Sequence, residues 1–204
     1  MSLLKQLMAK PWEHSGELEG VHGEVVVRHS TGQMGLWLFL AVVSSMFMLF
    51  IVSYYTRSQF PDWEKLTDPN ILWLNTGLLL LASVALQLAS NAAKRDAASS
   101  LRNALIAASL LTVAFVGGQL VAWEQLISAG YYVQGNPSTA FFYLVTGLHA
   151  VHLLGGLWYM LLVVIRLNRE QQREKALKSV ALCATYWHYL LLVWLILFAL
   201  LLRT

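Results

Sequence analysis

Three histidines of this chain stand inside apolar segments, where their type and spacing could support chemistry. His149 and His152 lie three residues apart in FFYLVTGLHAVHLLGG, residues 141–156, and His188 lies in YWHYLLLVW, residues 186–194. The i, i+3 spacing places His149 and His152 on nearly the same face of a helix. Imidazoles in such surroundings can hydrogen-bond to a neighbouring helix, ligate a haem iron as an axial pair, or relay protons together with carboxylates.

The composition assigns the chain to the integral membrane proteins. Hydrophobic residues make up 57% of the 204 and charged residues only 12%, with a mean hydropathy of +0.57, unlike ordinary soluble domains. A helix needs about 20 residues to cross a hydrocarbon layer of about 30 Å, and five apolar runs are long enough. They lie near residues 33–55, 71–92, 104–127, 139–165 and 179–202. We therefore predict an all-α bundle of five transmembrane helices in one domain, residues 33–204.

Residues 1–32 are polar and are predicted to form a cytoplasmic N-terminal tail, not a cleavable signal peptide. Cytoplasmic loops near membrane spans are enriched in lysine and arginine. In this chain, 11 of the 14 basic residues fall in the tail or in the loops after the second and fourth spans: Lys5, Lys10, Arg28, Lys94, Arg95, Arg102, Arg166, Arg169, Arg173, Lys175 and Lys178. The N-terminus is therefore predicted in the cytoplasm and the C-terminus outside. We expect these loops to contact anionic lipid head groups, and no nucleic acid.

Depth within the spans separates the possible roles of the polar residues. At about 1.5 Å per residue, His149 and His188 both lie roughly 15 Å deep and could face each other, as bis-histidine haem ligation requires. Glu124 is the only carboxylate within a predicted span, and it falls near the outer interface. A proton path would need carboxylates beside the imidazoles. Interhelical hydrogen bonding by the histidines is the third possibility.

Glycines and amides suggest where helices approach one another. Gly147, Gly155 and Gly156 would let a neighbouring backbone or a lipid chain come close to the fourth span. The pair at residues 117–118 in the third span could be another close-approach point or simply a tolerated weak spot, since glycine is common in membrane helices. A polar stripe on the second span is predicted to hydrogen-bond to another helix and consists of Asn75, Ser83 and Gln87. Cys183, which stands alone, excludes an internal disulfide and a metal site with several cysteines, and is interpreted as a packing residue.

The chain resembles subunit III of the haem-copper oxidases, the family of cytochrome c and quinol oxidases. Four segments match in order, namely GLWLFLA (35–41), WLNTGLLLLASVALQ (73–87), FFYLVTGLHAVHLLGG (141–156) and YWHYLLLVW (186–194). The TG-x-H-x-x-H pattern followed by Y-W-H is the most specific part. The resemblance covers all five spans, and the number of spans is similar to the short bacterial form of this subunit.

This resemblance implies an accessory role in the inner membrane of a bacterium. Subunit III has no haem or copper of its own, because these belong to partner subunits. It packs against the catalytic subunit I in a complex that includes subunit II, holds phospholipids, and supports proton uptake and the durability of the oxidase. His149, His152 and His188 match the family's intramembrane histidines. Glu124 matches the family's carboxylate late in the third span, and Arg166 matches the arginine that meets a lipid phosphate.

Val43 and Leu191 stand where the family has a buried glutamate and an aspartate. Losing both acids is physically coherent, because a buried carboxylate without its partner is costly. We interpret His188 as neutral and structural, and this chain as having dropped an acid-dependent proton role. Two alternatives remain open from the sequence. One is a subunit III-like protein of a nitric oxide reductase or quinol oxidase complex, and the other is an independent membrane protein that binds haem between His149 and His188.

Overall fold

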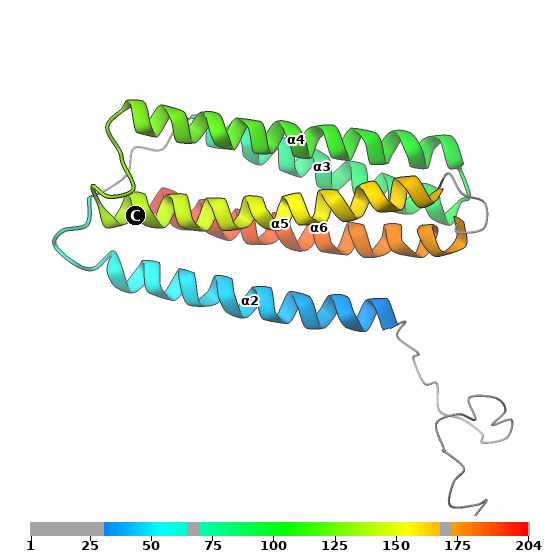
Figure 1. Cartoon of the computed structure of the whole chain (residues 1–204), viewed down its shortest axis with the longest axis horizontal. Helices are drawn as coiled ribbons and strands as arrows, with labels where there is room; N and C mark the ends of the chain where they lie inside the picture. The colour runs from blue at the N-terminus through cyan, green and yellow to red at the C-terminus, as the bar shows by residue number, and fades with distance from the viewer. Residues whose placement is uncertain (1–30, 65–69, 168–172, 204) are drawn as a thin grey trace, which may run out of the picture. The chain divides into compact units, whose positions relative to one another are not determined.

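The computed structural model describes residues 31–64, 70–167 and 173–203, and every regular element in these ranges is an α-helix. The helices are α2 (Thr31–Arg57), α3 (Ile71–Lys94), α4 (Ala98–Ser128), α5 (Pro137–Leu167) and α6 (Arg173–Arg203) (Figure 1). All five are long and apolar enough to cross a membrane, which confirms the predicted all-α membrane bundle. The predicted tail lies outside the described residues, except for residues 31 and 32, which begin α2.

The helices extend beyond the predicted spans at most ends. The largest differences are at the start of α4, predicted near residue 104 and found at Ala98, and at the start of α6, predicted near 179 and found at Arg173. Hydropathy marks only the part of a helix that lies in hydrocarbon. The backbone hydrogen bonds continue into the polar flanks, so that Arg102 and Lys178 are helical as well.

Short connections fix the direction of consecutive helices. Only residues 95–97 join α3 to α4, and Asp96 takes a left-handed conformation there with φ of 53°, which aspartate tolerates better than most residues. So short a link makes α3 and α4 antiparallel neighbours. Before α5, the side-chain oxygen of Asn136 accepts a hydrogen bond from the backbone N–H of Ser138 at 3.0 Å. Pro137 follows at the first helical position, where its missing N–H costs nothing.

Four of the helices form a closed ring, and the fifth lies outside it. Helix α3 contacts α4 and α6, and α5 also contacts α4 and α6, whereas α2 contacts only α5 and α6 among the described helices (Figure 1). The α3–α4 contact uses the predicted close approach at Gly118. A Cβ atom at this glycine would overlap the side-chain amide of Asn75, whereas Gly117 meets nothing within 4 Å. The ring therefore has a tight seam where α3 meets α4.

Described basic residues gather at one end of the ring. At this end α2, α4 and α6 begin and α3 and α5 end, and the basic residues that lie there are Lys94, Arg95, Arg102, Arg166 and Lys178. At the opposite end, among the described residues, are Arg57 and Arg203. This asymmetry is the basis of the orientation predicted above, and the cytoplasmic location of the basic end stays a prediction.

Candidate functional site

His149 lies in the centre of the protein and is fully buried, with 0% of its surface exposed. Its ring is surrounded by aromatic rings of three helices, with centroid distances of 6.4 Å to Phe47 of α2, 6.0 Å to Phe115 of α4 and 5.3 Å to Trp194 of α6. Neither ring nitrogen has a hydrogen-bond partner among the described residues. An unpaired buried polar group costs about 1–3 kcal/mol, and a charged one would cost more. These surroundings favour a neutral imidazole that packs against aromatic rings.

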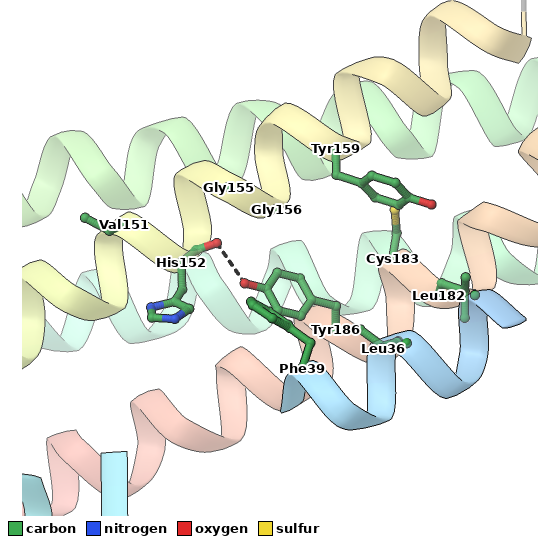
Figure 2. Close-up of a pocket in the computed structure, with 12 residues that line it drawn as sticks. Leu36, Phe39, Val151, His152, Gly155, Gly156, Tyr159, Leu182, Cys183 and Tyr186 are labelled. Atoms are coloured by element: carbon green, nitrogen blue, oxygen red, sulfur yellow. Dashed lines mark hydrogen bonds between the residues drawn. The ribbon is translucent and has the colours of Figure 1, made fainter. Parts of the chain in front are cut away.

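His152 is half-buried and lies on the side of α5 that faces α2. Its Nδ1–H donates to the carbonyl of Leu148 at 2.8 Å, and its own carbonyl accepts a hydrogen bond from the Tyr186 hydroxyl at 3.0 Å (Figure 2). The ring packs 5.6 Å from that of Phe47, which also contacts His149. The two imidazoles thus lie on one side of α5, as their spacing predicts.

His188 turns to different neighbours, on α3. Its Nε2 lies 3.0 Å from the side-chain oxygen of Gln87, which can only accept, so Nε2 carries the proton. The hydroxyl of Ser83 then donates to Nδ1 at 2.5 Å. The predicted use of Ser83 and Gln87 in interhelical hydrogen bonds agrees with this network. Haem ligation needs one free imidazole nitrogen, and α3 engages both nitrogens of His188.

Three tryptophan–threonine pairs connect the four helices of the ring. Each indole N–H donates to a threonine hydroxyl on another helix, and each of these hydroxyls donates in turn to the carbonyl four residues earlier at 2.6–2.8 Å. Each indole N–H and each threonine O–H of these pairs therefore has a hydrogen-bond acceptor. The pairs are Trp187 with Thr112 at 3.2 Å, Trp194 with Thr76 at 3.0 Å and Trp123 with Thr146 at 3.1 Å.

A pocket of about 620 Å³ opens between α2, α5 and α6, and its walls are mostly apolar (Figure 2). It begins near the first turn of α2 and reaches His152 in the middle of α5. Glycines form part of both walls, which keeps the space open. The lining residues are Gly32, Gly35, Leu36, Phe39, Val151, His152, Gly155, Gly156, Tyr159, Leu182, Cys183 and Tyr186.

The three glycines singled out on α5 have different surroundings. A Cβ atom on Gly156 would come within 2.7 Å of the Tyr186 ring and 2.8 Å of the Trp187 ring, so the close approach of α6 needs a glycine there. A Cβ on Gly147 would meet Trp123 at an ordinary 3.4 Å. Gly155 has nothing within 4 Å, because it faces the pocket.

Glu124 and Arg166 are both exposed near the ends of their helices. Glu124 lies four residues before the last residue of α4, at the end of the ring that also holds Arg57 and Arg203. Arg166 is the penultimate residue of α5 and follows the pocket residue Tyr159 by seven positions. Seven residues are nearly two turns, so Arg166 lies on almost the same face of α5, about 10 Å beyond the pocket.

The similarity to known proteins agrees with this arrangement. A model of the family "Cytochrome c oxidase subunit III" matches residues 5–202. The chain belongs to this family. Cytochrome c oxidase subunit 3 of Thermostichus vulcanus is 28% identical to it over 174 residues, which cover 82% of this chain and 85% of that protein. Quinol oxidase subunit 3 of Bacillus spizizenii is 22% identical over 171 residues, or 81% and 83% of the two chains.

A probable cytochrome c oxidase subunit 3 of Mycobacterium tuberculosis is 28% identical over 123 residues, which cover 60% of this chain and 61% of that protein. Membership of the family confirms the resemblance drawn from the sequence. The chain is an accessory subunit III of a haem-copper oxidase, a multi-pass membrane protein that associates with other subunits of such a complex. Subunits of this family have no redox centre of their own.

Several residues that build the site escaped the sequence analysis. The threonines of the tryptophan pairs and Phe47 were not singled out, because each pairing joins residues far apart in the chain and leaves no periodic trace. The pocket did leave a signal. Glycines recur at residues 32 and 35 of α2 as well as at residues 155 and 156 of α5, and reading the two helices together would have indicated an open space between them.

Proposed function

We propose that this chain supports a bacterial haem-copper terminal oxidase of the inner membrane by stabilising the catalytic subunit I, next to subunit II, and by holding a phospholipid in the α2–α5–α6 pocket. Aerobic electron transport and proton uptake then benefit from a more durable subunit I. The observation that carries the proposal is the alignment of an apolar pocket with Arg166 along one face of α5.

The dimensions suit one acyl chain and its head group. On α5 the pocket extends from residue 151 to residue 159, which is about 12 Å along the helix and most of one leaflet. Arg166 lies a further 10 Å or so toward the end of the helix, at the depth of head groups. A guanidinium can donate two parallel hydrogen bonds to phosphate oxygens. The described basic residues at the same end would attract anionic lipids to this leaflet.

The three intramembrane histidines have structural roles in this proposal. His188 is engaged by α3, His149 is enclosed by aromatic rings, and Nδ1 of His152 is bonded to its own helix. None has a carboxylate beside it among the contacts of the described residues, in keeping with Val43 and Leu191 replacing the family's acids. We therefore assign proton uptake to subunit I, with this chain as its support.

A quinol oxidase is the second candidate for the parent complex, because the Bacillus spizizenii relative carries that name. The sequence also left a nitric oxide reductase complex open because the family's two acids are absent, and the family membership argues against it. Affinity capture of this chain from detergent-solubilised membranes distinguishes them by the proteins that co-purify. We expect subunit I with a copper-binding subunit II, and recovery of nitric oxide reductase subunits would contradict the assignment.

The lipid proposal is tested by Arg166→Ala, with Arg102→Ala as the matched control at the same end of the bundle. We expect the Arg166 variant to lose phospholipid from the purified complex, and the complex to inactivate earlier during turnover at an unchanged initial rate. The control should retain the lipid, because Arg102 lies on α4, away from the pocket. An unchanged phospholipid count in the Arg166 variant would contradict the proposal.

A further inference from the structure

We infer that the α3–α6 face is the surface that docks against a membrane-spanning helix of a partner oxidase subunit. The inference rests on the proposed function, because it assumes that the parent complex is an oxidase. We define this face by the exposed residues of two adjacent antiparallel helices, which recur at helical spacing: Leu80, Val84 and Gln87 of α3 with Thr185, His188 and Leu192 of α6.

The α3–α6 face exposes polar groups at membrane depth. His188 is exposed and lies 12 residues after Ala176, the start of its span, which is about 18 Å into the membrane. Gln87 is also exposed and, through its hydrogen bond of 3.0 Å to His188, lies at the same depth. Lipid tails offer no hydrogen-bond partner. Histidines within spans almost always face protein or a water-filled cavity, and glutamines within spans hydrogen-bond to other helices.

The network within this face satisfies some of its polar atoms and leaves others available. The imidazole uses both nitrogens on Ser83 and Gln87. One N–H of the Gln87 amide donates to the side-chain oxygen of Asn91 at 3.3 Å, which leaves its second N–H and the amide N–H groups of Asn91 for another acceptor. A partner helix that presents a hydroxyl, amide or carbonyl oxygen at this height would complete the network.

Among the described residues, the other outward faces of the ring expose no amide or imidazole at the same depth, although α5 exposes Trp158 and Tyr159 there. The exposed side chains in the middle of α4 are apolar, for example Leu110 at 64% exposure and Leu120 at 57%. On α5 they include Val151 and Leu154. These surfaces are suited to lipid, whereas the α3–α6 face combines apolar side chains with the hydrogen-bonded side chains of Gln87 and His188. That combination is typical of helix–helix interfaces in membranes.

Site-directed photo-crosslinking in native membranes tests the docking face. A photoreactive amino acid is placed at Val84 or Leu192, and at Leu110 or Leu154 as matched apolar controls on other faces. We expect covalent adducts with a membrane-spanning oxidase subunit from the first two positions and lipid adducts from the controls. Oxidase adducts only from the controls would overturn the docking face but leave the proposed function standing. The absence of any oxidase adduct at all four positions would contradict both.

Two further outcomes of this experiment also decide the inference. Adducts with a second copy of this chain from Val84 or Leu192 would show a homodimer face, and lipid adducts alone from these positions would show a lipid-facing surface. Either result overturns the proposed partner. The position of the adduct on the partner subunit would identify the docked helix.

A double substitution, Gln87→Leu with His188→Leu, provides an independent measurement. The double variant loses the hydrogen bond between these two side chains but keeps an apolar side chain at each exposed position, so the helical content of the purified chain should be unchanged. Losing two or so polar contacts of the kind measured between membrane helices should weaken retention in the complex by roughly 5- to 10-fold. Leu110→Ala with Leu120→Ala on α4 is the control and should retain full association. Equal retention of both double variants would overturn the inference.

Discussion

The ring of α3, α4, α5 and α6 and the outer helix α2 are held by different forces. In the ring, three indole–hydroxyl pairs and the His188 network cross between helices. Helix α2 contributes a narrow stripe of four buried apolar residues, Leu40, Val43, Phe47 and Tyr54. Its one described side-chain hydrogen bond to the ring is accepted by the Ser44 hydroxyl from the Tyr189 hydroxyl at 2.9 Å, because the Ser44 hydroxyl itself donates to the carbonyl of Leu40.

This difference matters because a membrane provides no hydrophobic force between helices. Lipid tails are as apolar as leucine, so packing and hydrogen bonds decide which helices associate. The ring has both, whereas α2 depends mainly on the packing of its stripe. The gap beside this stripe is the pocket, and we propose that a lipid chain fills it. The four predictions that follow test this contrast, beginning with the largest expected effect.

Introducing a carboxylate into the α2 stripe should have the largest effect. Val43→Glu alone, at a position only 3% exposed, should weaken the attachment of α2 by about 3 kcal/mol, the cost of a charge near the centre of a membrane helix. Leu191→Asp alone should also destabilise the helix bundle. If the two acids form a self-contained pair near the histidines, the double variant should assemble with subunit I, as judged by affinity capture. Loss of assembly in the double variant would contradict this.

Two adjacent glycines of α5 compare the two regions directly. In Gly156→Ala the added methyl group overlaps the aromatic side chains of Tyr186 and Trp187 inside the four-helix ring. We expect this variant to lower the free energy of unfolding by about 1–3 kcal/mol. Gly155→Ala points into the open pocket, and alanine favours helix over glycine by up to about 1 kcal/mol. Thermal unfolding in detergent should therefore shift in opposite directions. Equal shifts would show that the α2 side is packed as tightly as the ring.

The indole–hydroxyl pairs can be tested at Thr112, which is fully buried. Thr112→Val keeps the shape but leaves the Trp187 N–H without its acceptor. We expect a loss of about 1–2 kcal/mol in the free energy of unfolding. Thr185→Val is the control, because Thr185 is exposed and its hydroxyl bonds, among the described residues, only to the carbonyl of Ala181 at 3.1 Å. If Thr185→Val lowered the free energy of unfolding as much as Thr112→Val, the stabilising role of the Trp187–Thr112 pair would be refuted.

The smallest effect is expected beyond the end of α2, where Arg57 and Asp62 form an exposed ion pair with two hydrogen bonds. The hydrogen bonds from Arg57 lower the pKa of Asp62 below its ordinary value. Their contribution to stability is therefore present above the ordinary aspartate pKa and is lost as the pH falls through the lowered value. Because solvent screens the pair, Asp62→Asn should leave the unfolding temperature at neutral pH unchanged within error.

The five helices could be predicted from hydropathy, but their neighbours could not. Leu72 is fully buried and Leu74 is 63% exposed, although both are leucines two residues apart in the same apolar run. A helix in lipid carries apolar side chains all round, so the sequence offers no sign of which face meets protein. Asn75, Ser83 and Gln87 are the exceptions, since polar residues must find partners, and their stripe correctly indicated the α3 hydrogen bonds.

The candidate site was predicted in part for the same reason. The spacing of His149 and His152 placed both on one face of α5, but the turn of His188 toward α3 depends on partners 101 and 105 positions away. The difference between Gly155 and Gly156 likewise depends on which ring lies opposite each backbone position. Such long-range pairings are set by the whole bundle and have no local pattern in the sequence.

The most direct test of the central claim is native mass spectrometry of the purified complex with Gly155→Leu. Leucine at this position would occupy the pocket without meeting protein atoms near its Cβ, and Gly117→Leu, which also projects into open space on α4, is the control. The account predicts that the Gly155 variant loses a bound phospholipid while keeping its full set of subunits, and that the control keeps both. Identical lipid counts in wild type, Gly155→Leu and Gly117→Leu would contradict it.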